Sequence, residues 1–311
     1  MIIKLLDYNI YSLNNNKTYT SVLPAHKLWA LKLGDYVMLV KMRLSLVVVI
    51  SSVLGYVIAS NGNGSLSEIV LLVMGGFLVT GAANALNQVL EKDFDILMTR
   101  TSNRPVATGR MKSSEGVMFA GLSCLIGISL LALFNPITAL LGMLSMIIYA
   151  FVYTPLKRYS TLAVAVGAVP GALPVMIGVT AFEGTVSLLA VCLFIVQFLW
   201  QFPHFWSIGF LGYEDYQKAG YKLLPENQGS LDRGLGLSAV FYGSLILPVI
   251  AFMYIRLDTS LVASIFVLIL TLGYIFLSYN FHKTFDKSSA LKLMFYSFFY
   301  LPFVLISYWL M

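Results

Sequence analysis

The sequence predicts an all-α polytopic membrane protein with nine transmembrane helices. Hydrophobic residues make up 59% of its 311 residues, charged residues make up 11%, and the mean hydropathy is +0.83. Soluble domains carry roughly 25% charged residues, so this composition excludes a cytosolic enzyme. It also excludes a disordered or collagen-like chain. The two cysteines, Cys124 and Cys192, lie inside apolar runs, and no disulfide framework is expected.

Nine stretches are long enough to cross a bilayer, which requires roughly 20 mostly apolar residues. They cover residues 44–60, 66–90, 117–134, 136–154, 161–182, 185–206, 236–255, 260–281 and 292–310. The turn pair Asn135-Pro136 separates the third stretch from the fourth, and Glu183-Gly184 separates the fifth from the sixth. Each span is expected to be helical, because lipid excludes unpaired backbone groups.

The connections between these spans divide the positive charges unequally. Of the 20 Lys and Arg residues, all but Arg256 lie in the N-terminal segment or in the connections that follow the even-numbered spans. The positive-inside rule therefore predicts a cytoplasmic N-terminus and an external C-terminus. This topology accounts for the basic charge, so no nucleic-acid partner is expected.

The spans also predict how the chain is organised. Residues 1–35 are expected to form a cytoplasmic tail, with an interfacial helix at about 27–40. Residues 36–311 are expected to form a single domain embedded in the cell (inner) membrane, with the lipid bilayer around it.

The connection after the second span begins with a polar stripe. Asn87, Glu91 and Asp95 are spaced i, i+4 and i+8, which places them on one slowly turning face of a helix. Polar groups near the membrane interior indicate a functional site by default, and an interhelical hydrogen bond is the alternative for residues such as Asn84. Carboxylates on one face suit Mg²⁺, which is commonly held by one or two carboxylates together with substrate phosphates.

Four basic residues accompany this stripe on the same predicted side: Arg100, Arg104, Lys157 and Arg158. Arginine can bind phosphate through two parallel hydrogen bonds. Acids, a metal and basic side chains beside an apolar cavity describe a diphosphate site. In a membrane-embedded protein, such a site suggests a prenyl donor.

The connection after the sixth span has a similar pattern. Gln197, Gln201 and His204 are spaced i, i+4 and i+7, and an acidic segment with Asp215 and Lys218 follows. His204 is one of three histidines in the chain. Its functional interpretations are a haem contact or a proton carrier, and its structural interpretation is a hydrogen-bonded residue between helices.

The pattern Asn87-x-x-x-Glu91-x-x-x-Asp95 resembles the Asn-x-x-x-Asp-x-x-x-Asp motif of the UbiA superfamily of intramembrane prenyltransferases. Glu91 stands where the family usually has Asp. Residues 100–105, 153–158, 167–174, 201–206 and 214–225 follow in order and are similar to one branch, the protohaem IX farnesyltransferases. The likeness covers roughly residues 35–250. The second connection offers Asp215 but lacks the paired Asp-x-x-x-Asp of quinone-type relatives.

This resemblance implies a UbiA-type helical bundle that converts haem B, farnesyl diphosphate and water into haem O and diphosphate, with Mg²⁺ as cofactor. Asn87, Glu91 and Asp95 would bind the metal and diphosphate, and Asp215 would complete the catalytic set. His204 would contact haem. The residues implied to bind diphosphate are Arg100, Arg104, Lys157, Arg158 and Lys218. The haem O product would be handed to a haem A synthase or to terminal oxidase assembly.

Three other functions remain open at this point. A UbiA-type enzyme could prenylate a quinone precursor or another lipid acceptor, although the segment 201–206 argues against this. A secondary transporter would also carry polar residues in its spans, but its site would lie near the midplane in broken helices. A non-enzymatic haem-delivery protein would have little need for a metal and diphosphate site.

Overall fold

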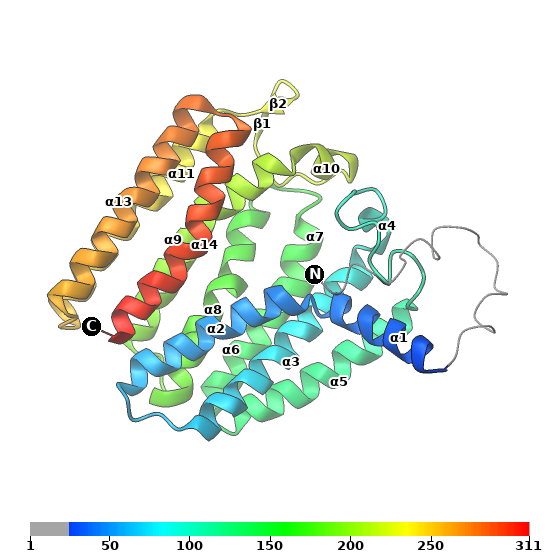
Figure 1. The fold of residues 1–311 in the computed structure, drawn as a ribbon, viewed down its shortest axis with the longest axis horizontal. Coiled ribbons are helices and arrows are strands. Elements are labelled where there is room, and N and C mark those ends of the chain that lie inside the picture. Colours follow the sequence, from blue (N-terminus) through cyan, green and yellow to red (C-terminus); the bar gives the residue numbers. More distant parts are fainter. Residues whose placement is uncertain (1–24, 311) are drawn as a thin grey trace.

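The computed structural model describes residues 25–310, which form a bundle of long helices (Figure 1). The elements are α1 (Ala25–Leu39), α2 (Met42–Ser60), α3 (Leu66–Leu90), α4 (Lys92–Asp95), α5 (Ser113–Ala132), α6 (Pro136–Ile147), the π-helix η3 (Ile148–Tyr153), α7 (Thr154–Leu156), α8 (Ala163–Glu183), α9 (Leu188–Leu211), α10 (Tyr213–Lys218), β1 (Glu226–Asn227), β2 (Ser230–Leu231), α11 (Gly234–Ser244), α12 (Ile246–Arg256), α13 (Leu261–Thr284) and α14 (Lys287–Leu310). The two short strands pair antiparallel as a hairpin.

Nine helical segments between residues 25 and 310 are long and apolar enough to cross a membrane, which confirms the predicted number. They are α2, α3, α5, Pro136–Leu156, α8, α9, Gly234–Arg256, α13 and α14. Two helix ends differ most from the sequence prediction. The sixth span was expected to end at residue 206, but α9 continues to Leu211, and the ninth was expected to begin at residue 292, but α14 begins at Lys287. The earlier start of α14 has a local cause: the carboxylate of Asp286 accepts a hydrogen bond from the Ser289 backbone N–H at 2.8 Å, which caps the first turn.

Two of these segments depart from a regular α-helix. In the fourth, the π-helix η3 lies between α6 and α7, and the Thr154 backbone N–H and hydroxyl both donate to the Tyr149 carbonyl. In the seventh, α11 and α12 meet at Leu245, close to Pro248, which has no N–H to continue the helical pattern. Both irregular segments remain long enough to span.

α8 occupies the centre of the bundle. In its most apolar 18-residue stretch, 78% of the residues are buried. In the other eight spanning segments, the corresponding share is between 28% and 56%. It packs against α2, α6 and α9. Where α2 crosses α8, a Cβ atom added to Gly178 would overlap the carbonyl oxygen of Ser52, and one added to Gly55 would overlap that of Val175. These two glycines therefore allow the two backbones to touch.

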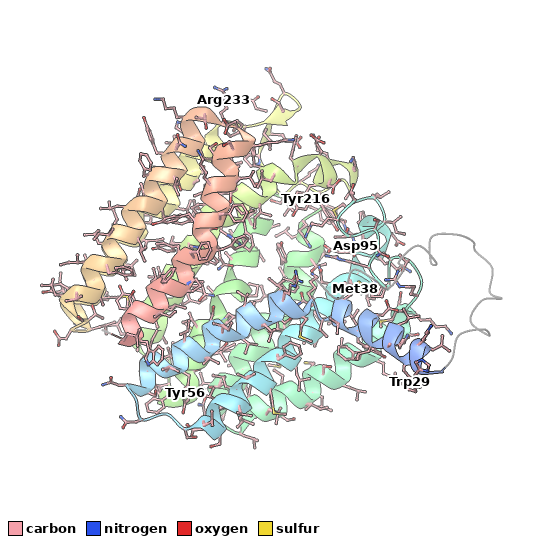
Figure 2. The ribbon with its side chains drawn as sticks, in the orientation of Figure 1. Trp29, Met38, Tyr56, Asp95, Tyr216 and Arg233 are labelled. Atoms are coloured by element: carbon pink, nitrogen blue, oxygen red, sulfur yellow. The ribbon has the colours of Figure 1, made fainter. Side chains whose placement is uncertain are left out.

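The short elements α4, α7 and α10 and the hairpin β1–β2 all lie toward one edge of the bundle (Figure 1). The two long connections meet there, because the Thr99 hydroxyl donates to the Asp215 carboxylate at 3.2 Å. Figure 2 shows Asp95 and Tyr216 at this edge and Tyr56 near the far end of α2. The polar segments that the sequence places after the second, fourth and sixth spans are thus gathered on one side.

The helix expected at about 27–40 is present as α1. Lys32 pairs with the Glu115 carboxylate of α5 at 2.7 Å, and Asp35 pairs with Arg110 at 3.0 Å. Trp29 and Leu33 are 76% and 66% exposed. Residues 1–24 of the predicted tail lie outside the described residues, and the domain boundary at residue 35 stays a prediction.

Candidate functional site

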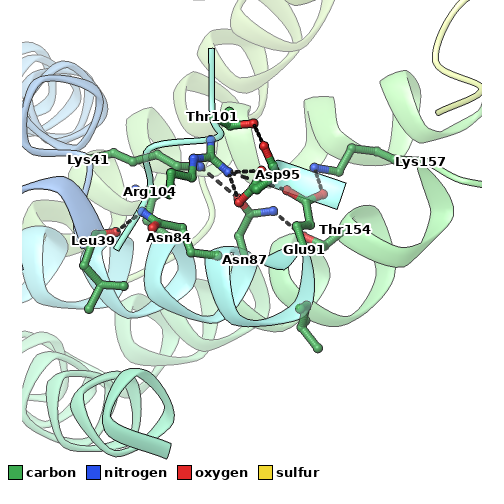
Figure 3. A network of polar contacts seen from close by, with 12 residues as sticks. Leu39, Lys41, Asn84, Asn87, Glu91, Asp95, Thr101, Arg104, Thr154 and Lys157 are labelled. Atoms are coloured by element: carbon green, nitrogen blue, oxygen red, sulfur yellow. Dashed lines mark hydrogen bonds and ion pairs between the residues drawn. The ribbon is translucent and has the colours of Figure 1, made fainter. Parts of the chain in front are cut away.

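The polar stripe at the end of α3 lies within a buried cluster (Figure 3). Asn87 belongs to the last turn of α3, Glu91 joins α3 to α4, and Asp95 ends α4; they are 1%, 3% and 0% exposed. The Asp95 backbone N–H donates to the Glu91 carbonyl at 2.8 Å, so the chain continues to turn helically beyond the end of α3. The predicted i, i+4, i+8 face therefore persists across the bend.

Two of the predicted basic residues pair with these acids. One guanidinium nitrogen of Arg104 lies 2.7 Å from both carboxylate oxygens of Asp95 and 4.0 Å from the Glu91 carboxylate. Lys157 forms an ion pair with the other oxygen of Glu91. The Thr101 hydroxyl donates to the Asp95 carbonyl at 3.0 Å, and this bond holds the loop that returns Arg104 to the cluster. Figure 3 shows Arg104 and Lys157 approaching the acids from opposite sides.

A third cation, Lys41, was not assigned to the site by the sequence reasoning. Its ammonium donates to the Asn87 side-chain oxygen at 2.9 Å, and the Asn87 side-chain nitrogen donates to the Thr154 hydroxyl at 3.1 Å. Lys41 has a positive φ of 49° at the corner between α1 and α2. Such a backbone conformation is uncommon outside glycine and often marks a functional site. No spacing rule connects Lys41 with Asn87, and only its place at the start of an apolar span could have drawn attention to it.

Two polar residues of α3 hold this corner in place. The Asn84 amide donates to the Val40 carbonyl at 3.3 Å and to the Ser45 hydroxyl at 3.1 Å. The Gln88 amide donates to the carbonyls of Met38 and Leu39. Asn84 thus makes the interhelical hydrogen bond that the sequence left open as its structural role. These bonds fix the backbone that presents Lys41.

Burial and charge act against each other on the two carboxylates. Burial alone would raise the pKa of Glu91, but Lys157, followed by Lys41 and Arg104, lowers that pKa below its usual value. For Asp95, burial dominates and raises the pKa even though Arg104 opposes it. Burial, reinforced by the positive charge of Arg104, lowers the pKa of Lys41 well below its usual value. The cluster is therefore a set of mutually dependent charges with little water around it.

Aromatic rings surround the cationic side of the cluster. The Lys157 ammonium lies 4.8 Å from the ring centre of Tyr153 and 5.5 Å from that of Tyr221. The Arg158 guanidinium lies 3.7 Å from the Phe94 ring centre, and the Phe94 and Tyr221 rings stack at 5.9 Å. Arg158 also donates to the Leu90 carbonyl at 3.0 Å. Arg158 therefore contacts the end of α3, whereas Lys157 faces the acids, and diphosphate binding by Arg158 stays a prediction.

The predicted residues of the second connection lie at its surface. Asp215 accepts from Thr99 and pairs with Lys218 at 3.3 Å, and the two side chains are 26% and 58% exposed. Arg100 is exposed near Thr99, and among residues 25–310 it has no ion pair. These three residues border the buried cluster without a direct contact to its acids in the described part of the chain. Their roles stay predictions.

His204 lies in α9, away from the acids. Its Nδ1 shares a hydrogen bond of 2.7 Å with the Ser297 hydroxyl of α14, and its ring stacks on Trp200 at 4.7 Å. These are the contacts of a buried residue between helices, which the sequence left open as its structural interpretation. The haem contact stays a prediction.

The oxygen donors available for a metal are few. Within residues 25–310, no group of three or more His, Cys, Asp or Glu side chains is placed to hold a metal ion. The predicted set consists of the Glu91 and Asp95 carboxylates and the amide oxygen of Asn87. This set fits Mg²⁺ in chemistry, because Mg²⁺ prefers oxygen and commonly completes its shell with substrate phosphates and water.

Comparison with known proteins identifies the family of the chain. The chain matches the UbiA prenyltransferase family over residues 48–299. A protohaem IX farnesyltransferase of Christiangramia forsetii is 38% identical over 280 residues, which cover 89% of this chain and 92% of the relative. One from Flavobacterium johnsoniae is 40% identical over 267 residues, which cover 84% and 88%.

Solved structures share the fold at lower identity. A digeranylgeranylglyceryl phosphate synthase superposes with a TM-score of 0.76 at 20% identity, over 89% of this chain and 97% of the other. A UbiA homologue from Archaeoglobus fulgidus, solved with GPP and Mg²⁺ bound, has a TM-score of 0.64 at 15% identity, over 88% and 99%. With the nine spans and the family match, these findings confirm the UbiA-type bundle. The chain belongs to the UbiA prenyltransferase family.

Proposed function

We propose that this protein transfers the farnesyl group of farnesyl diphosphate to a vinyl group of haem B, with addition of water, to make haem O and release diphosphate. The observation that carries this proposal is the buried cluster of two carboxylates and three cations at one edge of the bundle. The shared activity of the curated relatives favours haem as the acceptor over a quinone precursor. The edge position of the acids also differs from the midplane site of a transporter.

The cations are suited to the step that breaks the donor. The bond between the farnesyl carbon and the diphosphate oxygen breaks, and the electron pair leaves with diphosphate. Arg104, Lys157 and Lys41 are held where they can stabilise this negative charge as it develops. Each is held near the others by a partner in the cluster, Arg104 and Lys157 by carboxylates and Lys41 by the amide oxygen of Asn87.

The aromatic residues are suited to the other fragment. Ionisation leaves a positive allylic group, and the faces of Tyr153, Tyr221 and Phe94 can stabilise a cation by the attraction that Lys157 and Arg158 already display. Burial of the cluster protects this cation from premature reaction with water. The vinyl group of haem then forms the new carbon–carbon bond, and water adds to the resulting cation with loss of a proton.

We further propose that Mg²⁺ binds with the donor at Asn87, Glu91 and Asp95. When bound, the ion supplies positive charge to the leaving diphosphate. In the structure, the carboxylates pair with Arg104 and Lys157. When Mg²⁺ and diphosphate bind together, these two cations would exchange their carboxylate contacts for contacts with diphosphate. Asp215, Arg100 and Lys218 would meet the diphosphate from the surface. The site would face the cytoplasm of a cell that holds the protein in its inner membrane, and haem O would pass to a haem A synthase or to oxidase assembly.

Mass spectrometry of the haem product tests the proposal directly. Detergent-purified protein is incubated with haem B, farnesyl diphosphate and Mg²⁺, and the haem is then extracted. The expected product is heavier than haem B by a farnesyl group and a hydroxyl group, and it is absent when Mg²⁺ is chelated. Unchanged haem from folded protein that still consumes the donor would point to another acceptor and contradict the proposal.

A further inference from the structure

The second long connection brings one side chain directly to the buried cluster, and that side chain is Tyr221. Its ring lies 5.5 Å from the Lys157 ammonium and stacks on Phe94. The following residue, Lys222, donates its backbone N–H to the Lys157 carbonyl at 2.8 Å. The connection is therefore bonded to the backbone of Lys157, and this bond fixes the position of Tyr221 relative to the cluster.

The hydroxyl of Tyr221 has unused hydrogen-bonding capacity. Tyr221 is only 6% exposed, and its hydroxyl oxygen has no hydrogen-bond partner among residues 25–310. A buried polar group without a partner is costly and rare, so its presence requires an explanation. A phenol is protonated at neutral pH, so this hydroxyl can donate a hydrogen bond to an anion.

The surroundings select the kind of acceptor. The side chains near the phenol include the Lys157 ammonium and the aromatic rings of Phe94 and Tyr216. The Glu91 carboxylate lies close enough to influence the phenol, but the hydroxyl makes no hydrogen bond to it, and Glu91 is already paired with Lys157. An anion that binds Lys157 would lie beside the hydroxyl and supply the missing acceptor.

We propose that Tyr221 contacts the substrate, with its hydroxyl donating a hydrogen bond to a diphosphate oxygen of the prenyl donor. This proposal rests on the proposed function. It assigns to the second connection a buried donor, in addition to the surface carboxylate that the sequence suggests. The Tyr221 ring would at the same time form part of the wall beside the reacting allylic group.

The test compares Tyr221→Phe with Tyr213→Phe. The first variant removes only the buried hydroxyl and keeps the ring that stacks on Phe94. The second makes the same change in the same connection, where the hydroxyl donates to the exposed Glu226. Binding of inorganic diphosphate and of farnesyl thiolodiphosphate, an unreactive donor analogue, is measured with Mg²⁺ by calorimetry. Melting temperatures of both variants verify that the fold is intact.

The expected result is a Kd for both probes that rises roughly tenfold in Tyr221→Phe, which is the range for loss of one hydrogen bond to a charged group. Tyr213→Phe should bind as the wild-type protein does. The KM for farnesyl diphosphate should rise with the Kd, whereas a purely structural role would leave both unchanged.

The outcomes separate this proposal from the proposed function. Equal Kd values in Tyr221→Phe and wild type would overturn the contact, whatever the turnover. Wild-type protein that binds the analogue without prenylating haem would contradict the haem activity, and the Kd comparison would still decide the role of Tyr221. Wild-type protein that binds neither probe would overturn both.

Discussion

At the scale of single residues, the cluster joins three cations to two carboxylates. Arg104 is shared between Asp95 and Glu91, while Lys157 pairs with Glu91 and Lys41 with the amide of Asn87. When Lys41 is protonated, the cluster carries one more positive than negative charge, which suits a multiply charged anion such as diphosphate. An Mg²⁺ ion that arrives with this anion would bring the whole assembly close to neutrality, which a buried site requires.

Replacing Asp95 by Asn is expected to abolish haem prenylation. The change removes a negative charge that a metal requires, and it removes the partner of Arg104. Because Asn has nearly the same shape, the protein should still insert and fold. Product formation and the amount of protein in the membrane are measured together. Near-normal turnover in this variant would contradict the assignment of Asp95 to the metal site.

Replacing Lys157 by Met is expected to affect both activity and stability. It leaves Glu91 buried without its closest cation, and loss of one partner from a buried pair costs roughly 3–5 kcal/mol. Adding Glu91→Gln removes the unpaired charge, so the double variant should regain much of the melting temperature but no activity. Thermal unfolding in detergent measures the first effect. A double variant no more stable than Lys157→Met would contradict the strength of this pair.

Short-range spacing predicted the acids of the site, and the basic residues Arg104 and Lys157 were expected near them, but Lys41 and Tyr221 were not predicted. Asn87, Glu91 and Asp95 follow from helical periodicity, which holds across the bend after α3. Lys41 and Tyr221 reach the cluster only because α2 and the second connection pack beside it. No local pattern in a single sequence carries such long-range contacts.

At the scale of elements, the π-helix η3 sets the register between α3 and the fourth span. It directly precedes Thr154, which bonds Asn87, and Lys157, which pairs with Glu91. A π-helix makes one turn with more residues than an α-helix does, so it rotates the helical residues after it relative to those before it. The sequence predicted one continuous span here, because apolar composition does not reveal a change in helical winding.

Replacing Gly178 by Ala is expected to destabilise the bundle by about 1–3 kcal/mol, in the range of overpacked interiors. The new Cβ would overlap the carbonyl oxygen of Ser52. Because that oxygen belongs to the backbone of α2, it cannot rotate away as the end of a side chain could. Gly121→Ala in α5 is the matched control, since nothing lies within 4 Å of its Cβ position. Melting temperatures in detergent should fall for the first variant alone. Equal values would contradict direct backbone contact between α2 and α8.

At the scale of the whole molecule, the charged connections and the cluster share one edge of the bundle. The positive-inside rule predicts that this edge faces the cytoplasm. The prediction can be tested by single cysteines in a variant without Cys124 and Cys192. Asn63→Cys, in the short connection between α2 and α3, should react with an impermeant maleimide in intact cells. Lys222→Cys should react only after the membrane is opened. The reverse pattern would show that the orientation is inverted.

The number of spans was predictable because each must be long and apolar, and that property belongs to every segment separately. The break between α11 and α12 and the central place of α8 were not predictable in this way. Both depend on which helices surround a given span. The sequence shows that Pro248 lies within the seventh span but not how the chain bends there.

The partners of Asn87 have a consequence for how the protein is made. Lys41 is synthesised 46 residues before Asn87, and Thr154 follows it by 67 residues. A growing chain must therefore insert α3 with part of its polar end unmatched until the fourth span leaves the ribosome. The acids would have to remain near water or the insertion machinery during that interval. Nascent chains that stop between α5 and α7 would lack both Thr154 and Lys157, so Asn87 would miss one partner and Glu91 its closest cation.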